Sequence, residues 1–371
     1  MGDALPVVAG VALAVAHLPA AGDGSPAAGE WHHVAATAEG SVTIVVGRVV
    51  VGAARAAPAD VSQRLRRAVA EGGHGSAAAV LAGLDRAARD IPGAAGSAAL
   101  CVTLGPSGAV GWSAAGYAPP LSVGPDGARH LGGAPGEPLG LPGGPSFAHG
   151  EEELAAGTTL VVGSTGAVAG GPDPVAAVAA GHHDLPPDAL AAALTEEAGG
   201  TSPPGPGRTL VLARVLPAPL GQRLPADPRR LAALRRTVAA WSEQAALSED
   251  ATADLQLLLC EAATNAVEHA YRDTEAGDFA YSVRRLPDAG IRVSVEDSGR
   301  WRPPPDDPGY RGRGLAVIRR LATEISLDFS DRGTRIAFTV PGHVLPLDDE
   351  PPAAAAPGLT GPGGRAAEGS R

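Results

Sequence analysis

Residues 260–271 read CEAATNAVEHAY, and this stretch decides how the C-terminal half of the chain folds. Most of its residues are small or apolar, but Glu261, Asn265 and His269 interrupt them at intervals of four. Residues four apart on an α-helix share a face, so the spacing predicts a helix with one polar row. Such a row is often only a solvated face. The residues expected to pack this helix on a sheet are Leu257, Leu258, Ala263 and Val267.

The segments that follow favour a nucleotide site over a solvated face. In VSVEDSG, Asp297 ends a predicted strand, where its carboxylate can accept a hydrogen bond from an exocyclic amine. Gly299 lets a flat base approach the backbone. In RGRGLAVI, Gly312 and Gly314 lead into a predicted helix, whose free N–H groups and positive dipole end suit a phosphate. Each signal is weak alone, but their order and spacing together are specific.

Residues 220–342 resemble the GHKL (Bergerat-fold) ATPase domain in its anti-sigma-factor, histidine-kinase-like form. EAATNAVEHAY matches the N box, EDSG the first glycine box, GRGL the second, and GTRIAF the closing threonine motif. The resemblance implies an α/β sandwich in which ATP lies between the helices and the sheet. One departure is Trp301, which occupies the second glycine position of the first glycine box within a proline-rich loop.

The resemblance also assigns roles to individual residues. It implies that Asn265 ligates a Mg²⁺ ion that bridges the phosphates, in keeping with the preference of this ion for oxygen ligands. It implies that Glu261 is the general base for the attacking hydroxyl. Asp297 is expected to bind the adenine amino group. The other residues expected to bind ATP are Gly299, Gly312, Arg313, Gly314 and Thr334, of which 312–314 form the lid and Thr334 supports the adenine pocket.

The type of kinase follows from what the sequence lacks. A sensor kinase of this superfamily needs a dimerisation helix with a phosphorylatable histidine, whereas His182 and His183 lie in the proline-rich segment GHHDLPPD. The resemblance therefore favours the anti-sigma branch, whose members phosphorylate a STAS-domain anti-anti-sigma factor and sequester a sigma factor. It also implies a possible homodimer through the C-terminal domain.

The N-terminal half is predicted to be an α+β domain. Val- and Leu-rich runs such as SVTIVVGRVVV and RTLVLARV predict strands, and residues 58–73 and 76–91 predict two helices. Residues 5–215 resemble the PPM-type phosphatase domain of the stage II sporulation and sigma-B regulatory phosphatases. This resemblance implies a β-sandwich with flanking helices. Its motifs occur in family order, among them AAGEWHHV, VVGRVVVGA, AAGYAPPL and LVVGSTGAV.

The metal ligands of that phosphatase family are largely missing. The family holds two divalent cations with aspartates, and a bridging water attacks the phosphoryl group. Arg48 places a guanidinium where the family has a metal-binding aspartate, and this group repels a dication by several kcal/mol. The N-terminal domain is therefore predicted to be a pseudophosphatase that serves as a docking or regulatory module. A rival metal site would use Glu30, His32 and His33, but adjacent histidines on a strand point to opposite faces. The family's acidic positions are occupied here by Glu30, His33, Arg48, Thr165, Pro206 and Gly207.

Composition limits the remaining options. The net charge of −11 argues against a nucleic-acid binder, and all 29 basic residues are arginine, which excludes a catalytic lysine. Cys101 and Cys260 lie far apart in apolar surroundings, which favours a reducing, cytoplasmic location over a disulfide framework. Residues 7–20 are apolar but too few to span a membrane, so a buried strand is expected.

The predicted organisation is a phosphatase-like domain at 1–216, an ATP-binding domain at 217–345 and a disordered tail at 346–371. The predicted function is an ATP-binding regulator of sigma-factor partner switching, with serine/threonine kinase activity toward a STAS-domain protein. Two alternatives stay open: a phosphatase that works with atypical metal ligands, and a non-catalytic module that binds its partner under the control of ATP. A ligand-free scaffold is disfavoured by Glu261, Asn265 and Asp297 together.

Overall fold

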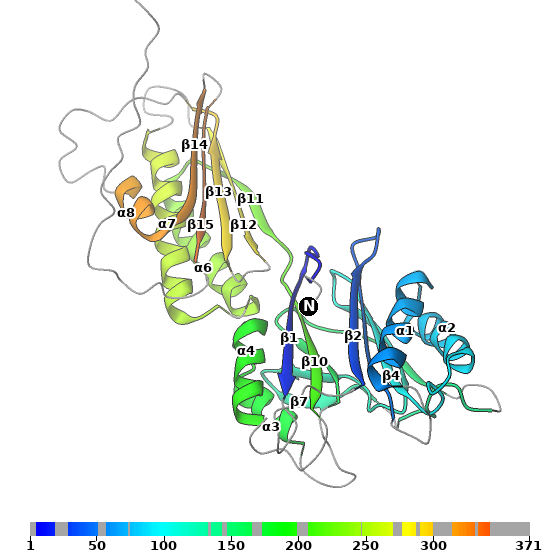
Figure 1. Ribbon diagram of the computed structural model, residues 1–371. Helices are drawn as coiled ribbons and strands as arrows, with labels where there is room; N and C mark the ends of the chain where they lie inside the picture. Colours follow the sequence, from blue (N-terminus) through cyan, green and yellow to red (C-terminus); the bar gives the residue numbers. More distant parts are fainter. Residues whose placement is uncertain are drawn as a thin grey trace, which may run out of the picture.

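Three five-stranded antiparallel sheets carry the part of the chain that the structure describes (Figure 1). Two of them lie in the N-terminal half and the third in the C-terminal half. The computed structural model describes residues 5–18, 29–50, 57–72, 75–132, 135–142, 147–164, 173–198, 207–245, 247–269, 277–286, 290–299, 314–330 and 333–341.

The N-terminal half is a sandwich of two sheets. Sheet 1 contains, in spatial order, β1 (Val11–Leu18), β10 (Arg208–Val215), β9 (Thr159–Gly163), β6 (Leu121–Gly124) and β7 (Gly127–His130). Sheet 2 contains β2 (Glu30–Ala36), β3 (Val42–Arg48), β4 (Ala98–Leu104), β5 (Ala109–Ala115) and β8 (Ala148–Glu153).

Side-chain alternation explains why the two sheets pack face to face. On β3, Ile44 and Val46 join the core between the sheets, whereas Val45 points to the opposite face. On β10, Val211 and Ala213 face sheet 2, whereas Leu210 and Leu212 face outward. All these side chains are almost completely buried, and a buried Val or Leu contributes about 1.5–3 kcal/mol.

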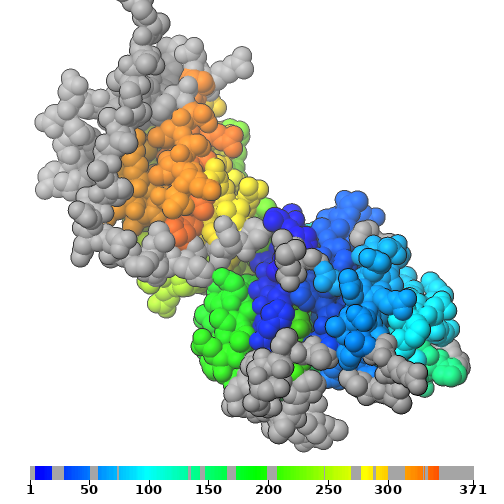
Figure 2. All heavy atoms as spheres, in the orientation of Figure 1, coloured from blue at the N-terminus to red at the C-terminus, as the bar shows by residue number. Residues whose placement is uncertain are grey.

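Helices cover both outer faces of the sandwich. α1 (Pro58–Glu71) and α2 (Ala77–Asp90) pack on sheet 2 (Figure 1). α3 (Pro174–Gly181), α4 (Pro187–Ala193) and the π-helix η1 (Leu194–Ala198) pack on sheet 1. Figure 2 shows the green residues of this second group beside the dark blue residues of β1. The predicted β-sandwich with flanking helices is confirmed.

The C-terminal half has a single layer of helices on one face of a sheet (Figure 1). The helices are α6 (Pro228–Gln244), α7 (Glu249–His269) and α8 (Gly314–Leu321). Sheet 3 contains, in spatial order, β11 (Leu220–Pro225), β12 (Asp278–Arg285), β13 (Ile291–Asp297), β15 (Gly333–Val340) and β14 (Thr323–Ser330). The predicted α/β sandwich is confirmed.

Several local predictions were wrong. The segment around 216–226, read as a break, forms the edge strand β11, because its backbone pairs with β12. The last predicted helix ends at Leu321 instead of continuing to residue 325, because the chain turns into β14. Leu257 is 43% exposed instead of packing on the sheet. Strands β2, β6, β7 and β8 and helices α3 and α4 were not predicted.

Other predictions agree with the structure. Residues 7–20 contribute the buried strand β1, and no described helix is both long and apolar enough to cross a bilayer. Both cysteines are free and buried. His182 and His183 lie between α3 and α4, as the proline-rich segment indicated. The C-terminal tail at 346–371 lies outside the described residues.

The start of α6 offers a direct test of local capping. Asp227 accepts a hydrogen bond from the backbone N–H of Arg229 at 2.9 Å, and Pro228 occupies the first helical position. We expect Asp227→Ala to lower the free energy of unfolding by about 1 kcal/mol, because one helix-end donor loses its partner. Urea unfolding measures this, with Asp227→Asn as the control. An unchanged midpoint in Asp227→Ala would contradict the capping role.

Candidate functional site

The polar row of α7 meets the first residue of α8. Glu261 and Asn265 are half-buried, beside the buried residues that pack α7 on sheet 3. A Cβ atom added to Gly314 would lie 2.6 Å from Oε2 of Glu261 and 3.5 Å from Nδ2 of Asn265. The start of α8 therefore lies against Glu261 and Asn265, and Gly314 places no side chain between them. His269 ends the same helix, and its side chain lies outside the described atoms.

A second group of predicted residues meets at the ends of β13 and β15. Oδ1 of Asp297 accepts a hydrogen bond from the N–H of Gly299 at 2.9 Å, and the backbone N–H of Thr334 also bonds to this carboxyl group. Burial raises the pKa of Asp297, and the two N–H groups oppose that rise. Gly333 has φ 135°, and a Cβ atom there would overlap the carbonyl oxygen of Asp297.

Both groups lie on the helix side of sheet 3. Val293 and Val295 of β13 belong to the core beneath the helices. Asp297 lies two residues further along the strand, so its side chain is on the same face of the sheet. Thr334 continues the core face of β15 in the same way, two residues before Ile336. The carboxylate of Asp297 and the polar row of α7 therefore border the same interlayer space.

The donor set of this space suits a nucleotide and Mg²⁺. Asn265 and Glu261 of α7 offer oxygen atoms, which are the ligands that a hard cation prefers. The start of α8 offers backbone N–H groups beside a glycine, which suit a phosphate. A half-buried carboxylate anchored by two N–H groups faces the same space from the sheet. Gly312, Arg313 and Trp301, which were also assigned to this site, lie outside the described residues.

Arg235 is a neighbour of this site that the sequence did not reveal. Its Nε lies 3.2 Å from Sγ of Cys260, and its pKa is raised by that contact and by the charge of Glu261. The side chain comes from α6, so only the packing of α6 on α7 places it here. No local pattern distinguishes Arg235 from the other arginines of that helix.

Two residues at the acidic positions of the phosphatase-like motifs lie at one end of the N-terminal sandwich. Glu30 and Arg48 are directly opposite each other on β2 and β3. Oε2 of Glu30 accepts a hydrogen bond from the backbone N–H of Thr209, whereas Oε1 is buried without a partner among the described residues. Burial raises the pKa of Glu30 to about 7, although Thr209 and Arg48 oppose the rise.

The side chains at this end do not fit a pair of divalent cations. Among the described residues, no three His, Cys, Asp or Glu side chains are grouped as a metal site would require. His32 shares the inward face of β2 with Glu30, and His33 alternates to the other face, which removes the rival site. Ser164 and Gly207 of the degenerate motifs are described, whereas Thr165 and Pro206 are not.

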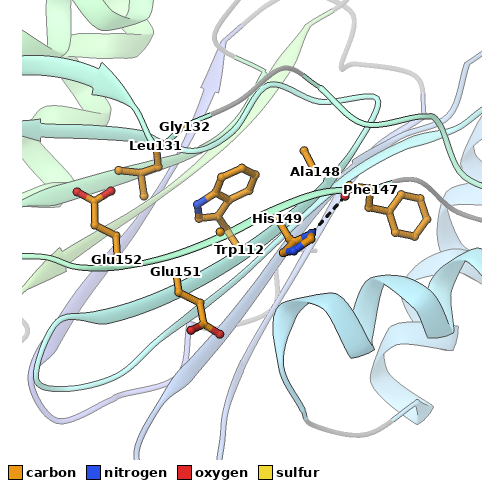
Figure 3. Close-up of a pocket in the computed structure, with 9 residues that line it drawn as sticks. Trp112, Leu131, Gly132, Phe147, Ala148, His149, Glu151 and Glu152 are labelled. Carbon is orange, nitrogen blue, oxygen red and sulfur yellow. Dashed lines mark hydrogen bonds between the residues drawn. The ribbon is translucent and has the colours of Figure 1, made fainter.

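The structure also has an open hollow of about 460 Å³, away from the predicted site residues (Figure 3). It lies along β5, β7 and β8, and the indole of Trp112 forms part of its wall. Its remaining lining includes Leu131, Phe147 and the acidic residues Glu151 and Glu152. None of the residues assigned to ATP or to the phosphatase motifs lines this hollow.

Comparison with known proteins identifies both halves of the chain. The family described as histidine kinase-like ATPase domain matches residues 224–340, and the stage II sporulation protein E family matches residues 39–215. The serine-protein kinase RsbW of Bacillus velezensis is 31% identical over 132 residues, which cover 32% of this chain and 81% of that protein. The RsbW protein of Listeria monocytogenes is 27% identical over 132 residues, covering 32% of this chain and 83% of that protein.

Two solved structures are also similar to parts of this chain. The RsbU and RsbW domains of Rv1364c from Mycobacterium tuberculosis are 26% identical, with a TM-score of 0.49, and cover 91% of this chain and 94% of that one. The phosphatase domain of SpoIIE from Bacillus subtilis is 16% identical, with a TM-score of 0.42, and covers 57% of this chain and 65% of that one.

The family matches coincide with the two groups of motifs and with the sheets that carry them. The match at 224–340 contains the polar row of α7, the start of α8 and the strand ends with Asp297 and Thr334. The match at 39–215 contains Arg48 and most of the N-terminal sandwich. The chain thus belongs to the histidine kinase-like ATPase family of the RsbW serine-protein kinases, and it carries a SpoIIE-like phosphatase domain in front of that ATPase domain.

Proposed function

We propose that this protein is an ATP-dependent serine/threonine kinase that regulates a sigma factor by partner switching. Its substrate is a serine of a STAS-domain anti-anti-sigma factor, and its N-terminal domain is a pseudophosphatase that regulates the exchange. The observation that carries this proposal is the contact of Glu261 and Asn265 with the start of α8. That contact borders the same interlayer space as Asp297 and Thr334.

The proposed reaction assigns one task to each described residue. Asp297 accepts a hydrogen bond from the adenine amino group, and the carboxamide oxygen of Asn265 holds Mg²⁺. That ion neutralises charge on the phosphates when it is bound. Glu261 accepts the proton of the substrate serine hydroxyl as its oxygen bonds to the γ-phosphorus, and the bond to the β-phosphate oxygen breaks to release ADP.

The position of Glu261 beside the start of α8 favours this role. A general base must be within hydrogen-bonding reach of the hydroxyl that it deprotonates. Gly314 brings the backbone of α8 against Glu261 without covering it with a side chain. A phosphate at this helix start would consequently lie beside the carboxylate.

We also propose domain limits of 1–216 and 217–345, a cytoplasmic location and a homodimer through the C-terminal domain. The regulatory role of the first domain is favoured by Arg48, which lies across from Glu30 where a metal-dependent enzyme needs anionic ligands. A phosphatase reaction is disfavoured for the same reason.

Calorimetric titration with Mg·ATP tests the nucleotide site. We expect Asp297→Asn to weaken binding by about tenfold to a hundredfold, because one of the two acceptor oxygens, which together serve the adenine amine and two backbone N–H groups, is replaced by an NH2 donor. Asp328→Asn, an exposed change on the edge strand β14 of the same sheet, is the control. Equal affinity in the parent and in Asp297→Asn would refute the assigned site, and absence of binding by the parent would refute the kinase.

A further inference from the structure

The end of the N-terminal sandwich gathers polar side chains in the space between its two sheets. On β2 and β3 the even-numbered residues face sheet 1, because Ile44 and Val46 do so and the strands pair directly. On β1 and β10 the odd-numbered residues face sheet 2, because Val211 and Ala213 do. The polar residues that follow these alternations at this end are His17, Glu30, His32, Arg48 and Thr209, and Tyr117 joins them from the loop after β5.

Two polar atoms in this group are buried without partners among the described residues. They are Oε1 of Glu30 and the hydroxyl of Tyr117, whose residue is only 3% exposed. Buried polar atoms are nearly always hydrogen-bonded, so these two point to a group that completes them. They are close enough that the charge of Glu30 raises the pKa of Tyr117, in addition to a larger effect of burial.

Arg48 supplies a cation to the same place. Its guanidinium lies over the ring of Tyr117, with Cζ 5.8 Å from the ring centroid, and it is half-buried. Among the described residues, it makes no ion pair with Glu30, although the two are cross-strand neighbours. Arg208 alternates to the outer face of β10, where burial lowers its pKa and the charges of Asp173 and Glu30 oppose that change.

The chemistry of these groups fits a protonated oxyanion better than a cation. A guanidinium donates to phosphoryl oxygens in a fixed fork, and a tyrosine hydroxyl donates one more hydrogen bond. A carboxylate would repel a fully ionised phosphate, but a phosphoryl O–H can donate to Oε1 of Glu30. A phosphate monoester keeps this proton in part of its population near neutral pH. A divalent cation would instead be repelled by Arg48.

We propose that this end of the sandwich is a metal-independent binding site for a phosphoryl group. Arg48 and Tyr117 donate hydrogen bonds to the phosphoryl oxygens, and Oε1 of Glu30 accepts a hydrogen bond from the phosphoryl O–H. The exposed His17 and the half-buried His32, whose rings lie 6.2 Å apart, stand beside this group. The site deepens the regulatory role proposed above, because a domain that binds a phosphoryl group without hydrolysing it can sense a phosphorylated partner. It does not depend on ATP binding.

The test is calorimetric titration of the full chain in a phosphate-free buffer with EDTA and no nucleotide. The probes are inorganic phosphate and a short phosphoserine peptide. We expect binding by the parent, at least tenfold weaker binding by Arg48→Met, and about fivefold weaker binding by Tyr117→Phe. Tyr281→Phe is the matched control, because its hydroxyl is also buried without a partner among described residues, but in the C-terminal half. Asn265→Ala controls for phosphate bound at the nucleotide site.

Three results would overturn the proposal. The first is absence of binding by the parent in EDTA. The second is equal affinity in the parent and Tyr117→Phe, a change too small to prevent folding. The third is loss of phosphate binding in Asn265→Ala but not in Arg48→Met, which would place the anion at the ATP site and leave the proposed kinase intact. Tighter binding of the peptide than of phosphate would identify a phosphoprotein as the source of the group, and equal affinity would identify a small anion.

Discussion

We expect Glu261→Gln to slow phosphoryl transfer to a serine by about a hundredfold to ten-thousandfold, because a general base contributes a factor of that size. Glutamine keeps the shape of the side chain and its contact with Gly314, but it cannot accept the serine proton. The affinity for Mg·ATP should change little, since the proton is transferred only in the reaction. The measurement is transfer of labelled γ-phosphate to recombinant STAS-domain proteins from the same organism.

The design separates catalysis from binding. Glu268→Gln is the matched control, because Glu268 is an exposed glutamate on the same helix. A parallel titration with Mg·ATP shows whether the nucleotide site has survived the change. If Glu261→Gln transferred phosphate as fast as the parent, the assignment of the base would be wrong. If it lost ATP affinity in proportion to its rate, Glu261 would be a binding residue.

The second large effect concerns the stability of the N-terminal domain. The pKa of Glu30 is raised from 4.5 to about 7, chiefly by burial. Below pH 4.5 the carboxyl group is protonated in both the folded and the unfolded states, so it does not penalise folding. Between pH 4.5 and 7 the unfolded state loses this proton and the folded state keeps it. Stability therefore falls as pH rises, by about 3 kcal/mol in total.

Glu30→Gln removes this dependence, because glutamine does not ionise. We compare the free energy of unfolding of the variant with that of the parent at two pH values. Between pH 5 and pH 8 this difference is expected to shift by about 2–3 kcal/mol in favour of the variant. Urea unfolding of the full chain in phosphate-free buffer, followed by tryptophan fluorescence, measures the difference. Glu39→Gln, which changes an exposed glutamate in a turn near β2, controls for the lost charge. Parallel pH profiles for the parent and Glu30→Gln would show that the carboxyl group is solvated.

Two glutamates in different surroundings have central roles in the two halves of the molecule. Glu261 is a half-buried carboxylate beside the start of α8, which suits a group that must exchange a proton with a substrate. Glu30 has one oxygen that is buried without a partner among the described residues, and burial raises the pKa of its carboxyl group, which suits a group that holds a proton. One glutamate, Glu261, is thus expected to act in catalysis, and the other, Glu30, in recognition of a phosphoryl group.

The motifs indicated the ATPase fold through their resemblance to a known family, and residue spacing alone indicated the helix that carries the polar row. A spacing of four places Glu261 and Asn265 on one helical face in any α-helix, whatever surrounds it. Caps at Asp227 and Ser248 define where α6 and α7 begin, because they depend only on neighbouring residues. The absence of aspartates from the phosphatase motifs was equally visible, since it is a matter of residue identity.

The tertiary structure alone decided which distant groups meet. β11 forms although its sequence suggests a break, because an edge strand is stabilised by the backbone of β12 and needs no apolar pattern. The pairing of β2 with β3 and the loop after β5 bring Glu30, Arg48 and Tyr117 to one end of the sandwich. Such contacts join residues far apart in the chain, and local propensity carries no information about them. The burial of Glu30, which sets its proton affinity, is decided in the same way.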